Sequence, residues 1–223
     1  MYDKIYDMYA NIGLGSCDVC QECSSNKWWD LESAGRIGPV PIYYIGRDYV
    51  NQDKKIVFVG SAGYGWDEHL PKRTIDYKNL GKDQRSTLIC KMEEAHDWLL
   101  NDDKQISTYR VLRKFLKKYY SNLDATSNIC LTNIVHCNKG NISYSFPADI
   151  RFHCAHEQAN LTVTKKEIEI LRPDIIVGLC TTKDRYYIDE WQFSWPVKKV
   201  CYGHPSRKNI EAYVDDILKQ IED

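Results

Sequence analysis

Five cysteines of this chain are spaced in a way that suits metal chemistry. Cys17, Cys20 and Cys23 recur at every third residue, and Cys137 and Cys154 bracket a loop that follows an apolar run. The chain has nine cysteines, an odd number, and no recognisable secretion signal, which argues against a disulfide framework. Thiolates are soft, strongly donating ligands, so we expect some of these cysteines to bind a metal ion or a cluster.

A second set of chemical groups lies in or directly after apolar runs. Asn133 lies in one such run, and its amide carries both a donor and an acceptor. His204 comes directly after another apolar run and before Pro205. The glycine-rich stretch 60–65, GSAGYG, allows a ligand to approach the backbone closely. An amide, an imidazole and an accessible backbone are groups that can recognise and activate an organic ligand.

Buried strands are the elements that must position these groups. Continuous apolar runs predict them at 54–60, 129–135, 174–179 and 197–202, with an edge strand at 42–45. Helical patterns are found at 1–14, 84–100, 108–120, 155–171 and 207–221. The alternation predicts an α/β fold, a three-layer α/β/α domain with a mainly parallel sheet of about four strands and its active site at the strand carboxyl ends.

The composition fits one soluble domain spanning residues 1–223. Apolar residues make up 43% and charged residues 27%, and there is no apolar run of about 18 residues that would span a membrane. We therefore expect a cytoplasmic monomer without a membrane partner. The net charge of −1 leaves nucleic acid open as a partner. Basic side chains along the predicted helix 108–120 either follow a phosphate backbone or form an ordinary solvated face.

The motifs, taken in order, resemble the uracil-DNA glycosylase superfamily. They are VFVGSAG, CLTNIVHC with its following loop and later cysteine, a strand after Arg172 and Pro173, and a final strand before His204, Pro205 and Ser206. The resemblance covers roughly residues 10–210, apart from an insertion at about 66–104, and is closest to the iron-sulfur branch. It implies a DNA glycosylase that hydrolyses the N-glycosidic bond of a flipped-out base and leaves an abasic site.

The resemblance also implies a cofactor. In that branch four cysteines hold a four-iron, four-sulfur cluster, which here would join a cysteine-rich N-terminal segment to the loop after the Asn133 strand. The matching ligands are Cys137 and Cys154 with Cys17 and Cys20, or with Cys23 as the alternative N-terminal ligand.

A structural zinc ion with mixed ligation is the alternative to the cluster. The histidines available for it are His136, His153 and His156. The remaining cysteines lie in predicted helices or strands, where we expect buried thiols; they are Cys90, Cys130, Cys180 and Cys201.

The same resemblance assigns roles around the base. Asn133 matches the asparagine that pairs with the edge of the flipped base, and His204 matches the histidine that supports negative charge on the leaving base. The glycine-rich loop would contact the base through Gly60, Ala62, Gly63 and Tyr64. Phosphate contacts are expected from Ser206, Arg207 and Lys208, where the pattern predicts the start of a helix.

Ser61 departs from the family pattern. The family commonly has an acidic or polar side chain directly after the first glycine, near the attacking water, and serine has no carboxylate. Asp67 or Glu68 would then supply the charge if the loop folds back. The small residues of this loop favour a bulky modified base over plain uracil, for example a hypermodified base of phage DNA, in repair or in defence.

Two other functions fit parts of the sequence. Loss of the carboxylate at Ser61 is compatible with a nucleic-acid-binding protein of the same fold that has no activity. A serine hydrolase would use Ser61 as nucleophile and His204 as base, although Val59 occupies the position where a nucleophile elbow has glycine.

Overall fold

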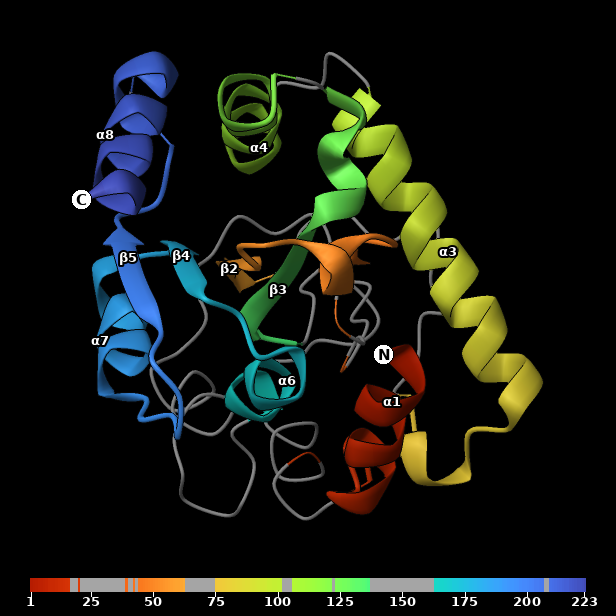
Figure 1. The fold of residues 1–223 in the computed structure, drawn as a ribbon. Helices are drawn as coiled ribbons and strands as arrows, with labels where there is room; N and C mark the ends of the chain where they lie inside the picture. Colours follow the sequence, from red (N-terminus) through yellow and green to blue (C-terminus); the bar gives the residue numbers. More distant parts are fainter. Residues whose placement is uncertain are drawn as a thin grey trace. The chain divides into compact units, whose positions relative to one another are not determined.

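The computed structural model of the protein describes residues 1–16, 20, 39, 42, 44–62, 75–101, 106–121, 123–136, 163–206 and 209–223. In these residues the chain is a mixed α/β protein with a five-stranded, mainly parallel sheet in the order β1-β3-β2-β4-β5 (Figure 1). The strands are β1 (Tyr44–Ile45), β2 (Ile56–Ala62), β3 (Ile129–Val135), β4 (Ile175–Leu179) and β5 (Lys198–Tyr202). The α-helices are α1 (Tyr2–Asn11), α3 (Lys82–Asn101), α4 (Ser107–Tyr119), α6 (Val163–Leu171), α7 (Thr182–Glu190) and α8 (Ile210–Glu222). Short 3-10 turns are η1 (Tyr49–Asn51), η2 (Tyr77–Asn79) and η3 (Leu123–Asn128).

The sheet confirms the predicted mainly parallel arrangement. The four long apolar runs form β2 to β5, and the predicted edge strand is β1, which pairs antiparallel with β3. Strand β4 runs parallel to β2 on one side and to β5 on the other. The first four residues of β2, Ile56 to Val59, have no exposed surface, as expected for a parallel strand that is covered on both faces.

The chain divides into two compact units. The first comprises Met1–Tyr43, Ala62–Glu93 and Asn133–Leu171, and the second comprises Tyr44–Ser61, Glu94–Thr132 and Arg172–Asp223. Helix α1 packs against α6 and η2 in the first unit. In the second unit α8 packs against α4 and β5, and α7 also packs against β5.

The core of the first unit is aromatic. Tyr6, Tyr9 and Tyr77 form a triangle with ring centroids 4.9 to 5.8 Å apart. Helix α1 ends before two glycines, as predicted, and Gly15 has a φ of +88°. A Cβ on Gly15 would lie 1.8 Å from the carbonyl oxygen of Ile75, so only glycine allows this close approach to the segment before η2.

Helices α4 and α8 of the second unit lie side by side and share ion pairs (Figure 1). Lys114 Nζ lies 2.5 Å from Glu211 Oε2, and Lys118 contacts both Glu211 and Asp215. These contacts lower the pKa of Glu211, with the hydrogen bond from Lys114 as the largest cause. Lys114 and Lys118, two of the basic side chains along α4, are therefore paired with acidic side chains of α8. This pairing is compatible with the interpretation of these positions as an ordinary solvated helix face.

Several details differ from the predictions. Helix α7 was not predicted, and α8 begins at Ile210, about three residues later than expected. Cys130 and Cys180 are buried as predicted, whereas Cys90 lies on the exposed face of α3 and Cys201 is only partly buried. None of the described helices combines the length and the apolarity needed to cross a membrane.

Candidate active site

The register of the sheet brings three strand ends into line in the second unit. Gly60 of β2 pairs with Leu179 of β4, and Leu179 pairs with Tyr202 of β5. Ser61 follows directly on Gly60, and His204 comes two residues after Tyr202. Because the three strands are parallel, these side chains leave the sheet at its carboxyl edge, where α/β proteins bind their ligands.

Ser61 is held by the start of helix α7. Its Oγ donates a hydrogen bond of 2.6 Å to Asp184 Oδ2 and accepts one of 3.1 Å from the backbone N–H of Thr181. Thr181 is the N-cap of α7, and its own hydroxyl donates to the same Asp184 oxygen at 2.6 Å. Asp184 has no exposed surface. The helix start favours this buried negative charge through its N–H groups and its dipole.

Thr181 and Asp184 are the site residues that the sequence reasoning missed. They form a capping box, Thr-x-x-Asp, directly after the buried strand β4. This pattern is a recognisable helix start, so it would have predicted α7 and the position of its carboxylate. The contact with Ser61 depends on the pairing of β2 with β4 and has no signal in the sequence.

The surroundings of His204 favour the neutral form of its imidazole. Its Nδ1 accepts a hydrogen bond of 3.2 Å from the backbone N–H of Ser206 and lies 2.9 Å from Ser206 Oγ. Burial lowers the pKa of His204, and the negative charge of Asp184 opposes this shift only in part. With Nδ1 engaged as acceptor, the proton of the neutral ring is assigned to Nε2.

The arrangement does not favour a serine hydrolase. A nucleophilic serine gives its proton to a histidine, which must accept a hydrogen bond from the hydroxyl. Here the hydroxyl of Ser61 donates to Asp184, and Nδ1 of His204 is engaged by Ser206.

Asn133 belongs to the first unit, at the end of β3. It is 7% exposed, and its backbone carbonyl oxygen accepts a 2.8 Å hydrogen bond from the hydroxyl of Thr164 on α6. Its side-chain amide makes no hydrogen bond to another residue of the described ranges. The backbone that carries the amide is held by α6 through the hydrogen bond from Thr164.

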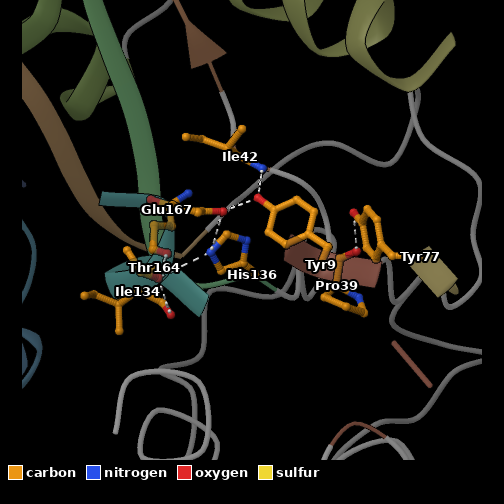
Figure 2. Close-up of polar contacts among 9 residues, drawn as sticks. Tyr9, Pro39, Ile42, Tyr77, Ile134, His136, Thr164 and Glu167 are labelled. Carbon is orange, nitrogen blue, oxygen red and sulfur yellow. Dashed lines mark hydrogen bonds and ion pairs between the residues drawn. The ribbon is translucent and has the colours of Figure 1, made fainter. Parts of the chain in front are cut away.

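A buried polar network lies in the first unit (Figure 2), and it includes Thr164, whose hydroxyl bonds to the backbone of Asn133. The phenol of Tyr9 donates to Glu167 and accepts a 2.7 Å hydrogen bond from the backbone N–H of Ile42. His136 Nε2 lies 3.5 Å from Glu167 Oε1 and 3.3 Å from Thr164 Oγ1. The network joins α1, α6 and the end of β3 through groups that are almost fully buried.

The described part of the predicted metal site is Cys20. Its Sγ accepts a hydrogen bond from the backbone N–H of Gly15 at 3.3 Å. In the part of the chain that the structure describes, no three His, Cys, Asp or Glu side chains come together as metal ligands. The other predicted ligands lie outside that part, as do two of the histidines proposed for zinc; they are Cys17, Cys23, Cys137, Cys154, His153 and His156.

Some predicted base and DNA contacts also lie outside the described residues. They are Gly63, Tyr64, Asp67, Glu68, Arg207 and Lys208. Helix α8 begins after Asn209, whose Oδ1 accepts hydrogen bonds from the backbone N–H groups of Glu211 and Ala212. Two N–H groups at this helix start are therefore satisfied by the cap, and the predicted phosphate contacts of Ser206, Arg207 and Lys208 stay a prediction.

Comparisons with known proteins add no further assignment. No protein-family model matches the chain, and no curated protein matches it significantly. The chemistry of the site therefore follows from its own residues.

Proposed function

We propose that this protein is a DNA glycosylase of the uracil-DNA glycosylase superfamily, with that family's three-layer α/β/α fold. It would hydrolyse the N-glycosidic bond of a uracil or modified base turned out of the DNA and leave an abasic site. The observation that supports this most is the state of His204, whose pKa is lowered by burial and whose Nδ1 is engaged by Ser206. A neutral imidazole with its proton on Nε2 is a donor for negative charge that develops on a departing base.

The reaction needs few other groups. As the bond from C1′ to the base nitrogen breaks, its electron pair moves onto the base, and Nε2–H of His204 donates to the oxygen that gains charge. The role that the resemblance gives to Asn133 is to read the edge of the flipped base, and its amide suits that role because it carries both a donor and an acceptor. Water adds to C1′ on the opposite face of the sugar as the bond to the base breaks.

A bulky modified base is the favoured substrate. Ser61 and Ala62 are small, and the hydroxyl of Ser61 is tied to Asp184. The side chain after Gly60 therefore does not project as far as a glutamate would. A hypermodified base of phage DNA would fit such a loop, in a defence role, and uracil in a repair role is the alternative.

The four-iron, four-sulfur cluster remains part of the proposal, with Cys20, Cys137 and Cys154 and either Cys17 or Cys23 as ligands. The Gly15 N–H aimed at Cys20 Sγ supports it, because N–H···S contacts stabilise the thiolate of a metal ligand. The cluster would fix the N-terminal segment and the loop after β3. For the zinc alternative, ligation through Nε2 of His136 would break its contacts with Glu167 and Thr164.

An abasic-site assay tests the proposal. The protein, purified without oxygen and analysed for iron, zinc and visible absorption, is incubated with single- and double-stranded DNA that contains uracil, hypoxanthine, hydroxymethylcytosine or glucosylated hydroxymethylcytosine. Alkaline cleavage then reports abasic sites. We expect cleavage at one of these bases, with the fastest rate at a bulky one.

Two variants of His204 test whether this side chain stabilises the departing base. His204→Ala should lower the single-turnover rate about 10²- to 10³-fold, as for the loss of one charge-stabilising donor. His204→Gln keeps an N–H donor and should retain more activity. If the iron-loaded protein binds DNA but forms no abasic site at any of the bases, the glycosylase proposal is wrong and an inactive binding protein is favoured.

A further inference from the structure

The contact between Ser61 and Asp184 places a carboxylate beside the residue that follows Gly60, a position where this chain has a serine. We propose that these two residues form a relay that orients the attacking water, with Ser61 in contact with the water and Asp184 as the positioning residue behind it. The inference rests on the proposed glycosylase function and names the group that activates the water in it.

Among the residues that the structure describes, two groups bond to the hydroxyl of Ser61, the carboxylate of Asp184 and the N–H of Thr181. A serine hydroxyl has one proton and two lone pairs. The proton goes to Asp184 Oδ2 at 2.6 Å, and one lone pair accepts from the N–H of Thr181 at 3.1 Å. The second lone pair is thereby fixed as the acceptor for a further donor, and a water molecule can occupy that position. Ser61 is only partly buried, at the carboxyl edge of the sheet.

Asp184 cannot act on the substrate directly. Its side chain has no exposed surface, and its Oδ2 also accepts from the hydroxyl and the N–H of Thr181. Its negative charge nevertheless polarises the hydroxyl of Ser61, because the bond between them is short and little exposed to solvent.

The relay accounts for every proton of the step. The water oxygen bonds to C1′ as the bond from C1′ to the base nitrogen breaks, and the electron pair of that bond stays on the base beside His204. The water gives one proton to Ser61 Oγ while the proton of Ser61 moves to Asp184 Oδ2. That proton returns through Ser61 to solvent when the products leave.

A purely structural role for Asp184 is the competing explanation, since it belongs to the capping box of α7. Capping explains the contacts of Asp184 with Thr181. It does not require the hydroxyl of Ser61, which comes from another strand 123 positions away. A double-mutant cycle separates the two roles. If Ser61 and Asp184 act as one relay, either single substitution removes its whole contribution to the rate, and the second substitution costs nothing more. If Asp184 acts only as a cap, its effect is independent of Ser61 and the two losses multiply.

The test measures single-turnover rates at saturating DNA for the base that the unaltered protein releases fastest. Ser61→Ala, which leaves the capping box intact, and Asp184→Asn, which keeps an acceptor for Thr181 but removes the charge, should each lower the rate about 10²-fold. The double variant should be no slower than the single ones, and DNA affinity should stay within about twofold. The matched control is Asp174→Asn, at the other end of β4, where the carboxylate accepts from the N–H of Lys55 at 2.8 Å. Its rate should remain within about twofold of the unaltered protein.

Distinct results overturn the relay and the proposed function. If the unaltered protein forms abasic sites and either Ser61→Ala or Asp184→Asn works at its full rate, the relay alone is wrong. Multiplicative losses in the double variant would also overturn it and would assign Asp184 to the stability of α7. If the unaltered protein forms no abasic site, the glycosylase proposal fails and the relay with it.

Discussion

The phenol of Tyr9 donates a hydrogen bond to the carboxylate of Glu167, which lies 158 positions further along the chain, and neither side chain has any exposed surface. The same phenol accepts from the N–H of Ile42 at 2.7 Å. Burial, followed by the charge of Glu167, raises the pKa of Tyr9 well above its ordinary value. Tyr9 therefore stays protonated and serves as donor and acceptor at once.

Removing this hydroxyl should destabilise the protein strongly. Tyr9→Phe leaves a buried carboxylate without one donor and the N–H of Ile42 without its acceptor, which should cost about 2–3 kcal/mol in the free energy of unfolding. Urea denaturation followed by circular dichroism measures it. Tyr186→Phe, at a tyrosine that is 58% exposed, is the control and should change stability by less than about 0.5 kcal/mol. Equal stabilities of the two variants would contradict a structural role for the buried network.

The lowered pKa of His204 should appear in the pH dependence of stability. The unfolded chain takes up a proton at this side chain near pH 6.5, whereas the folded protein takes it up only at lower pH. The unfolded state therefore binds more protons in the window just below pH 6.5, and stability falls as pH decreases through it. His204→Gln removes the titrating group, so the difference in unfolding free energy between the two proteins should vary with pH only in this window. A difference that is constant from pH 5 to 8 would contradict the shift.

A glycine at position 121 should stabilise the end of α4. Ser121 follows the C-cap residue Tyr120 and has a φ of 57°, a conformation that costs a non-glycine residue roughly 1 kcal/mol. Part of the gain from Ser121→Gly is offset by the larger freedom of glycine in the unfolded chain, so we expect a net increase of about 0.5 kcal/mol, measured from the melting temperature. Ser86→Gly, on the exposed side of α3, should have the opposite sign, because glycine disfavours a helix interior. Two shifts of the same sign would refute this explanation.

The lysines of α4 that are paired with α8 should contribute little to DNA binding. Lys114 and Lys118 are engaged by acidic side chains of α8, so replacing both by alanine should leave the affinity for DNA within about twofold. Replacing Arg207 and Lys208 by alanine removes two proposed phosphate contacts, so it should weaken binding and reduce the dependence of log K on log salt by up to about two. Fluorescence anisotropy at several salt concentrations measures both. The reverse order of effects would place the DNA along α4.

The sheet was predictable because its strands are continuous apolar runs. The run at β2 is covered on both faces, and no helical pattern competes with it. The first helix was also recognisable, since Ile5 and Tyr9 lie on one face and both are buried. Helix α7 was missed because its sequence, TKDRYYIDE, is mainly polar and has no clear apolar stripe.

The site was predictable only where a motif is local. Asn133 lies near the end of one apolar run and His204 follows another, and the structure places Asn133 in the last residues of β3 and His204 after β5. The carboxylate beside Ser61 could not be identified in the same way, because the sequence gives no sign that β2 pairs with β4. Asp67 was proposed instead because it is near Ser61 along the chain, a criterion that favours neighbours in sequence over neighbours in space.

The distance along the chain between Tyr9 and Glu167 has a consequence for protein synthesis. Helix α1 leaves the ribosome well before its buried partner on α6, which follows 158 residues later. At about 5–20 residues per second, the aromatic face of α1 waits about 8–30 seconds for that partner. During translation this face lacks the buried partner that covers it in the folded protein, so the contact between α1 and α6 can form only after α6 has been made.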